Sequence, residues 1–327
     1  MKIFLNIIFL SLCALSIFAD DIDVFGVDDI TQQKILKRFG RPVLMNQKKI
    51  FYARSSGVNM EQKNLEQAIV HQFHLPAVRF ENVYYPNHSF YTTIEVLPKP
   101  LQESASYQYI PKKPYDLIDR MIIFKDEAIK LYLKQPQLAS ELQCLDFHCL
   151  VEEHSILQSE LDDFRKLVPQ QMVLVDKTLL GDKNLERQRA AIFLLAYYPN
   201  HKLILQRLET LLHHQNRFIV HDTLRLLGEY LKHYPKTSVN IKQISNFLSA
   251  HDLAVRHKAL LVLEVLAHQK CHHLELKQEA GQALLELLKL KQPNNHELAY
   301  QILCLISQKN DADTDLPAWN KWLEDGK

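Results

Sequence analysis

The densest group of potential metal ligands lies between residues 144 and 154, where Cys144, His148, Cys149 and His154 fall within eleven residues. Thiolate and imidazole are groups that bind zinc and copper well. The spacing matches no standard zinc site, and four ligands from so short a segment require a tight loop. A disulfide between Cys144 and Cys149, beside two surface histidines, is therefore the preferred interpretation. A metal-binding or thiol-dependent enzyme that uses this segment is the alternative function.

A disulfide between Cys144 and Cys149 requires the chain to reverse its direction. On a continuous helix, residues five positions apart face different directions and lie about 8 Å apart, too far for a disulfide. We therefore expect a turn at residues 146–148. With Cys271 and Cys304 there are four cysteines beyond the N-terminal segment and three possible connectivities. Cys304 lies in an apolar helical stretch and is expected to be a buried thiol.

The rest of the sequence carries no enzyme motif. Its seven glycines are scattered and form neither a phosphate-binding loop nor a dinucleotide fingerprint. The G-x-S-x-G, H-E-x-x-H and EF-hand patterns do not occur. The 39 basic and 38 acidic residues nearly cancel, so the chain has no basic stripe of the kind that binds nucleic acid. We predict no catalytic residues, no cofactor, no metal and no nucleic-acid partner.

The N-terminus has the features of an export signal. Lys2 precedes an apolar stretch over residues 7–18, and Ala19 comes directly before an acidic segment. The stretch is shorter than the ~20 residues that span a bilayer. We predict that residues 1–19 are cleaved, which leaves a periplasmic or secreted protein without a transmembrane segment, in a compartment that favours disulfides. An uncleaved anchor is the alternative, because Ile17 is larger than the residue usual at that position.

Residues 20–98 alternate between strand and helix patterns. Period-two alternation indicates strands, and apolar residues three or four apart indicate helices. A helix that begins near Asp29 is expected to end at Gly40 and Pro42. The predicted order is β-α-α-β-β, with strands over 21–27, 78–84 and 90–96, helices over 29–39 and 65–73, and a hairpin turn at 86–88.

This order, behind an export signal, resembles the POTRA domain of outer-membrane assembly and secretion proteins. Residues 22–26, Ile-Asp-Val-Phe-Gly, correspond to the first strand and the turn glycine of that family. The resemblance implies that residues 20–98 bind partners by addition of a strand to an exposed sheet edge. A small α+β domain that only packs against the helical part is the alternative.

The C-terminal part is helical and repetitive. Residues 99–114 contain several prolines and are expected to form a linker. Residues 115–310 follow with helical periodicity, and 311–327 form a polar tail with a short helix around Trp319 and Trp322. A small residue followed four positions later by leucine recurs at offsets of 33, 36 and 40 residues, which are typical of two-helix solenoid repeats. These pairs are Ala190/Leu194, Thr223/Leu227, Ala259/Leu263 and Ala299/Leu303.

Two of these segments resemble the first helix of a HEAT repeat. The patterns are Asp182…Arg187-x-x-Ala190-x-x-x-Leu194 and Asp252…Arg256-x-x-Ala259-x-x-x-Leu263. Asp252 is also well placed to cap its helix. The middle segment departs from the family, because Thr223 replaces the alanine. The resemblance predicts the fold class: a mainly α protein, with a HEAT-like α-α solenoid preceded by the small α+β, POTRA-like domain.

In HEAT proteins the second helix of each repeat lines the concave surface. The outward positions of the corresponding helices here are polar and nearly uncharged, which suits a protein or peptide partner, although an ordinary solvated face has the same composition. The sequence predicts an exported scaffold or adaptor that binds through this surface; a structural envelope component without a specific site is a further alternative. The six predicted binding residues are Lys202, Gln206, Lys242, Asn246, Gln278 and Gln282.

Overall fold

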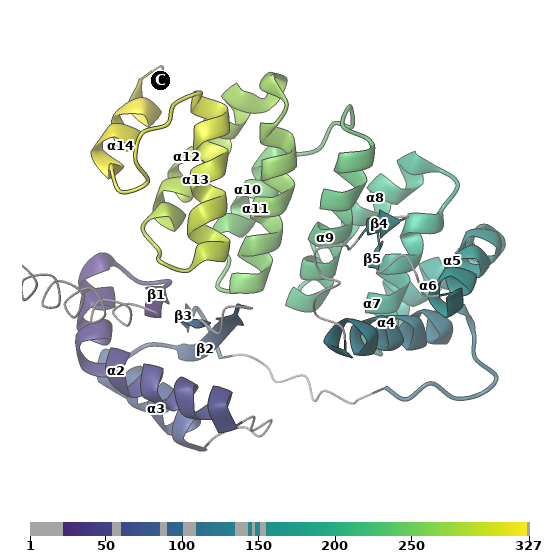
Figure 1. Cartoon of the computed structure of the whole chain (residues 1–327), viewed down its shortest axis with the longest axis horizontal. Coiled ribbons are helices and arrows are strands. Elements are labelled where there is room, and N and C mark those ends of the chain that lie inside the picture. The colour runs from purple at the N-terminus through teal and green to yellow at the C-terminus, as the bar shows by residue number, and fades with distance from the viewer. Residues whose placement is uncertain are drawn as a thin grey trace, which may run out of the picture. The chain divides into compact units, whose positions relative to one another are not determined.

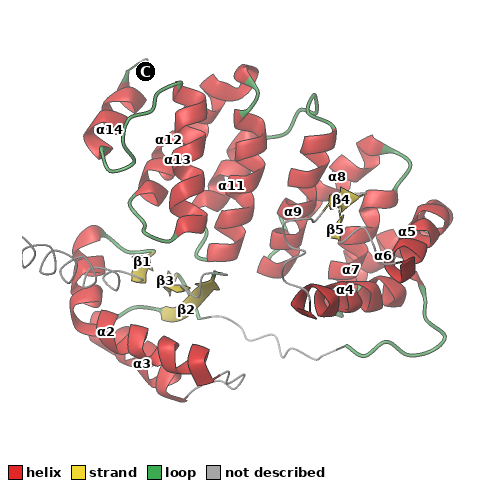
Figure 2. Ribbon diagram, viewed as in Figure 1, coloured by secondary structure: helices red, strands yellow, loops and turns green. Residues whose placement is uncertain are grey.

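The computed structural model describes residues 22–53, 60–85, 90–100, 109–134, 143–145, 148–150 and 155–325. The predicted export signal and the hairpin turn at 86–88 lie outside these residues. The described chain is mainly helical, with a small sheet near its N-terminus (Figures 1 and 2). Backbone contacts divide it into two compact units. The first contains Met1–Gln102, Ile241–Leu260 and Lys270–Lys327, and the second contains Glu103–Asn240 and Leu261–Gln269.

The first unit contains a mixed sheet of β1 (Ile22–Phe25), β2 (Ala77–Tyr84) and β3 (Phe90–Leu97). β3 is central, parallel to β1 and antiparallel to β2. The helices α2 (Asp29–Ala53) and α3 (Met60–Phe73) lie between β1 and β2 in the chain. The predicted β-α-α-β-β order is therefore confirmed.

One face of this sheet packs against α2 and α3. Strand side chains alternate between the two faces of a sheet, and on this face the alternate positions are apolar. Burial of these side chains holds the two helices against the strands. The buried core residues are Val24, Ile35, Phe39, Val43, Ile69, Val78, Phe80, Ile94 and Val96.

Helix α2 is longer than the sequence predicts. The expected end at Gly40 and Pro42 is wrong, because α2 continues to Ala53 with Pro42 in its interior. An interior proline costs a helix roughly 3 kcal/mol through the lost hydrogen bond and the ring clash. Beyond the proline, Val43 and Gln47 are buried, and the Gln47 Oε1 accepts a hydrogen bond of 2.7 Å from the Asn82 side chain on β2. These tertiary contacts stabilise the second half of the helix against its local preference.

Gly26 makes the turn that follows β1. Its φ of 97° is unfavourable for any residue with a Cβ. A Cβ at this position would lie 2.6 Å from both the Val96 carbonyl oxygen and the His251 Nδ1. The absence of a side chain therefore allows β1 to stay against β3 while the chain turns toward α2.

We expect Gly26→Ala to lower the free energy of unfolding by about 2–4 kcal/mol, because it combines a strained φ with a clash against backbone. Chemical denaturation of the purified chain would measure this. Gly40→Ala is the matched control: a Cβ at Gly40 meets its nearest atoms at 4.0 Å, and alanine is favoured in a helix by about 1 kcal/mol. Equal stability losses in both variants would contradict this account.

The first unit also contains the C-terminal helices. They are α10 (Ile241–Asn246), the start of α11 (Leu253–Ala267), α12 (His273–Leu288), α13 (Pro293–Ser307) and α14 (Leu316–Glu324). Helix α12 contacts α10, α13 and α14. Helix α14 lies in the predicted polar tail, as expected around Trp319 and Trp322, and both tryptophans are buried.

The second unit is a set of packed helices with one short hairpin. Its elements are α4 (Leu117–Lys134), β4 (Gln143–Leu145), β5 (His148–Leu150), α5 (Ser155–Leu167), α6 (Met172–Gly181), α7 (Leu185–Leu194), α8 (His201–Leu211) and α9 (Arg217–His233). Helix α7 packs between α4 and α9, while α6 packs on α7 and α8 packs on α9. Ala190 on α7 and Thr223 on α9, the small residues of the repeated pattern, are fully buried.

None of the described helices has both the length and the apolar character needed to cross a bilayer.

Candidate binding surfaces

All six residues that the sequence predicts to bind a partner are exposed. Lys202 and Gln206 lie one turn apart on α8, in the second unit. The other four belong to α10 and α12 of the first unit, where the Lys242 ammonium lies 3.8 Å from the Glu279 carboxylate. Gln282 donates a hydrogen bond of 3.3 Å to Glu286 one turn later. These faces are polar and open to solvent.

The segment with the cysteine and histidine ligands forms the antiparallel pair β4–β5, in which Cys144 lies directly opposite Cys149. The chain therefore reverses direction between them. The side chains of Cys144, His148 and Cys149, and the whole of His154, lie outside the described residues, so the disulfide and the metal site both stay predictions. Among the described side chains, no cluster of potential ligands could hold a metal ion.

The remaining two cysteines are free thiols. Cys271 is exposed, and Cys304 is half-buried, whereas the sequence predicts a buried thiol. Burial raises the pKa of the Cys304 thiol, which lowers its reactivity at neutral pH.

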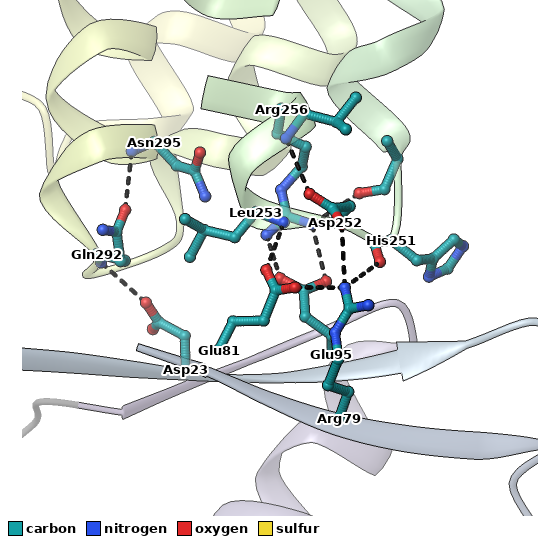
Figure 3. Close-up of polar contacts among 12 residues, drawn as sticks. Asp23, Arg79, Glu81, Glu95, His251, Asp252, Leu253, Arg256, Gln292 and Asn295 are labelled. Carbon is teal, nitrogen blue, oxygen red and sulfur yellow. Dashed lines mark hydrogen bonds and ion pairs between the residues drawn. The ribbon is translucent and has the colours of Figure 1, made fainter. Parts of the chain in front are cut away.

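The second face of the N-terminal sheet carries buried charges that meet the helices of the same unit (Figure 3). Arg256 of α11 and Glu95 of β3 are both completely buried. Two parallel hydrogen bonds of 2.8 and 2.5 Å join the Arg256 guanidinium to the Glu95 carboxylate. Arg256 also donates to the Ala250 carbonyl at 2.7 Å and lies 3.8 Å from the centroid of the Phe25 ring. This bidentate pair fixes the orientation of α11 on the sheet.

Three further charged residues extend this pair. Arg79 of β2 forms ion pairs with Glu81 and with Asp252, at 3.2 Å from the latter. The Glu81 carboxylate accepts a hydrogen bond of 2.8 Å from the backbone N–H of Leu253. Asp252 caps α11 as predicted, because its Oδ1 accepts from the Val255 N–H at 3.0 Å. We call Arg79, Glu81, Glu95, Asp252 and Arg256 the sheet–helix charge cluster.

The sheet–helix charge cluster holds three carboxylates against two guanidinium groups, which leaves one excess negative charge in a buried place. Burial and the neighbouring Asp252 raise the pKa of Glu81 to about 7, against the opposing charge of Arg79. One carboxyl group of the cluster is therefore expected to take up a proton near neutral pH.

A second polar contact joins the sheet to the start of α13. The Asp23 carboxylate of β1 accepts hydrogen bonds of 2.9 and 2.8 Å from the N–H groups of Lys291 and Gln292. Carboxylates are favourable at the N-terminus of a helix, where N–H groups are left without partners inside the helix. The Tyr85 hydroxyl donates to Asn294 at 2.8 Å nearby. These polar side chains are engaged with one another, so this face serves as an internal contact.

Arg187, the other arginine of the HEAT-like pattern, is also the centre of an ion-pair network. Arg187 of α7 contacts Asp182 at 3.0 Å, Asp116 at 2.7 Å and Asp119 at 2.5 Å. The Tyr109 hydroxyl accepts from Arg187 at 3.2 Å. Tyr109, in the predicted linker, is thus tied to the helices of the second unit.

A different group of cations lies on α4, α7 and α9. The Lys125 ammonium of α4 lies 4.3 Å from the centroid of the Phe193 ring on α7, and the Arg225 guanidinium of α9 lies 5.5 Å from it. Arg189 of α7 forms ion pairs with Asp222 at 2.7 Å and with Glu186 at 3.1 Å. No local sequence pattern indicates this group, because its members come from three helices that are far apart in the chain.

The edge of β2 is occupied at one point by a side chain of α3. The Glu66 carboxylate accepts a hydrogen bond of 3.3 Å from the Phe80 N–H. An edge N–H that is already bonded cannot pair with an incoming strand. Strand addition at β2 therefore requires the Glu66 carboxylate to move away.

No protein-family model, curated protein or solved structure matches this chain. The described residues form a mainly helical protein with a small mixed sheet near the N-terminus.

Proposed function

We propose that this protein is an exported scaffold or adaptor that binds a protein or peptide partner. The observation that carries the proposal is the layered packing of α4, α7 and α9, with α6 and α8 on α7 and α9. Helices that stack in successive layers leave extended faces open, and such faces are suited to hold another chain. The exposed polar residues on α8, α10 and α12 supply hydrogen-bonding groups for that purpose.

We further propose that the helices form a HEAT-like α-α solenoid and that the N-terminal domain is POTRA-like. The recurring small-residue positions and the ion pair between Asp182 and Arg187 support the first assignment. The β-α-α-β-β order and the positive φ of Gly26 support the second. Export to the periplasm or medium rests on the apolar N-terminal stretch.

Affinity purification of the mature chain from its native host, under mild conditions, tests this function. We expect a stoichiometric protein partner to be recovered with the wild-type chain. Two double variants test the surface: Lys202→Glu with Gln206→Glu on α8, and Lys242→Glu with Asn246→Glu on α10. At least one of them should lower the recovery of the partner at least tenfold. Lys321→Glu, which reverses an exposed charge on α14, serves as the control. Recovery of the wild-type chain alone would count against the proposal.

The pairing of β4 with β5 favours the disulfide over the thiol-dependent enzyme. In an antiparallel pair, directly opposite residues lie about 4.5–5.5 Å apart at Cα, within the range of a disulfide. Mass spectrometry of the exported, denatured chain is expected to show alkylation of Cys271 and Cys304 alone before reduction, and of all four cysteines after it. A stoichiometric metal that is lost in Cys149→Ser would instead establish the metal site.

A further inference from the structure

Two cations that contact the Phe193 ring, Lys125 and Arg225, are half-buried without an ion pair to another described residue. Arg189 engages both nearby carboxylates, those of Asp222 and Glu186. Among the described residues, Lys125 and Arg225 have neither a hydrogen bond nor an ion pair of their own. Both are half-buried.

The charges of this group do not balance. Lys125 and the charges that act on it comprise three cations, Lys125, Arg189 and Arg225, and the carboxylates of Glu186 and Asp222, which leaves one positive charge. His221 on α9 also contacts Asp222, with its Nδ1 at 2.9 Å. Burial opposes ionisation of Asp222, but the His221 hydrogen bond and the charges of Arg189 and Lys125 lower its pKa to about 2. The Asp222 carboxylate is therefore ionised at neutral pH.

Because Lys125 is partly buried, its pKa should respond to a bound anion. Desolvation is the largest cause that lowers the pKa of Lys125 to about 8, with Arg189 and Arg225 acting in the same direction against Asp222 and Glu186. Charges in a partly desolvated place interact more strongly than in water. An anion bound here would stabilise the charged form of Lys125 and raise its pKa.

We propose that Lys125 and Arg225 bind a carboxylate side chain of a protein partner. The single excess charge matches one carboxylate better than a doubly charged phosphate. Phe218, which is 37% exposed, has its ring 5.4 Å from the Arg189 guanidinium and 4.5 Å from that of Arg217. This aromatic side chain gives the site an apolar neighbour. The segment that fits is therefore an acidic residue next to an apolar one.

This inference rests on the proposed function, because its ligand is a protein. It places the binding of that ligand on a different surface from the one formed by the predicted polar positions. The site lies on α4, α7 and α9, whereas the predicted polar positions of the second unit lie on α8. Binding of a defined peptide does not require the host partner, so the two proposals fail separately.

Fluorescence anisotropy with the mature chain and a labelled, capped peptide of alternating Asp and Leu tests the site. The expected dissociation constant rises at least tenfold in Lys125→Met and in Arg225→Met, which keep the apolar part of each side chain. Lys177→Met, at an exposed position of α6 in the same unit, is the matched control and is expected to bind as the wild type does. Near-ultraviolet circular dichroism checks that each variant is folded.

Two further measurements decide the chemistry. Affinity is expected to fall as the pH rises above about 8, where Lys125 loses its proton, and this fall should be absent in Lys125→Met. A peptide of Asn and Leu is expected not to bind. Equal binding of the Asn peptide, or unchanged binding by Lys125→Met, would overturn the proposal. Stronger binding of a phosphoserine peptide would overturn the assignment to a carboxylate.

Discussion

Arg256→Met is expected to lower the free energy of unfolding by about 3–5 kcal/mol, because it leaves the Glu95 carboxylate buried without its counter-charge. Both side chains are completely inaccessible to solvent, so water cannot replace the lost partner. Chemical denaturation at pH 7 would measure the loss. The single replacement Glu95→Leu should have an effect of similar size, since it leaves the Arg256 guanidinium buried without its counter-charge.

The double variant Arg256→Met/Glu95→Leu separates the ion pair from the surrounding packing. Replacing a whole buried pair by apolar residues is often neutral or stabilising, so the double variant should recover most of the loss. The remaining deficit would report the bond to the Ala250 carbonyl and the contact with Phe25. If the two single losses simply add in the double variant, the pair is not coupled and this interpretation is wrong.

Glu81→Gln is expected to change how stability depends on pH. The pKa of Glu81 is raised from 4.5 to about 7 in the folded chain. Between these values the folded state holds more protons than the unfolded state, so this group makes the free energy of unfolding fall as the pH rises from about 4.5 to 7. Glutamine stays neutral and can still accept the Leu253 N–H, so the variant should be more stable than the wild type above pH 7, by up to about 3 kcal/mol.

Denaturation curves between pH 4 and 8 would test this. The two proteins should have similar stabilities near pH 4.5 and diverge as the pH rises. Glu61→Gln is the matched control, because Glu61 forms an exposed ion pair with Lys49 and lies outside the cluster. Parallel stability profiles for the wild type and Glu81→Gln would show that Glu81 titrates as an ordinary glutamate.

The sequence predicts those elements whose signals are local. The period-two alternation around β1, β2 and β3 and the apolar spacing of the helices establish the β-α-α-β-β order. Asp252 is recognisable as a cap because its bond to Val255 spans only three residues. Pro42 leads to a wrong helix end for a related reason. It is a local signal for the end of a helix, whereas the contacts that stabilise the helix beyond it come from β2, which is distant in the chain.

The charged contacts could not be predicted, because their partners are distant in the chain. Glu95 and Arg256 are separated by 161 positions, and no repeat or motif connects them. In the alternating pattern of β3, Glu95 occupies a position that normally faces solvent. It is buried because helices of the C-terminal part cover the second face of the sheet. The group around Lys125 and Arg225 arises in the same way, from the packing of α4 and α9 on α7.

The first unit is formed by segments from the N-terminal and the C-terminal parts of the chain, and this affects the order in which the protein folds during synthesis. Its strands are made early in translation, whereas the hydrogen-bond partners of the Glu95 and Asp23 carboxylates come from the last third of the chain. Contacts of such high sequence separation form slowly. We expect most of the second unit, which is nearly continuous in the chain, to acquire its structure first. The sheet should complete its packing only after ribosomal release, and until then the nascent polypeptide would carry unneutralised acidic groups on an uncovered sheet surface.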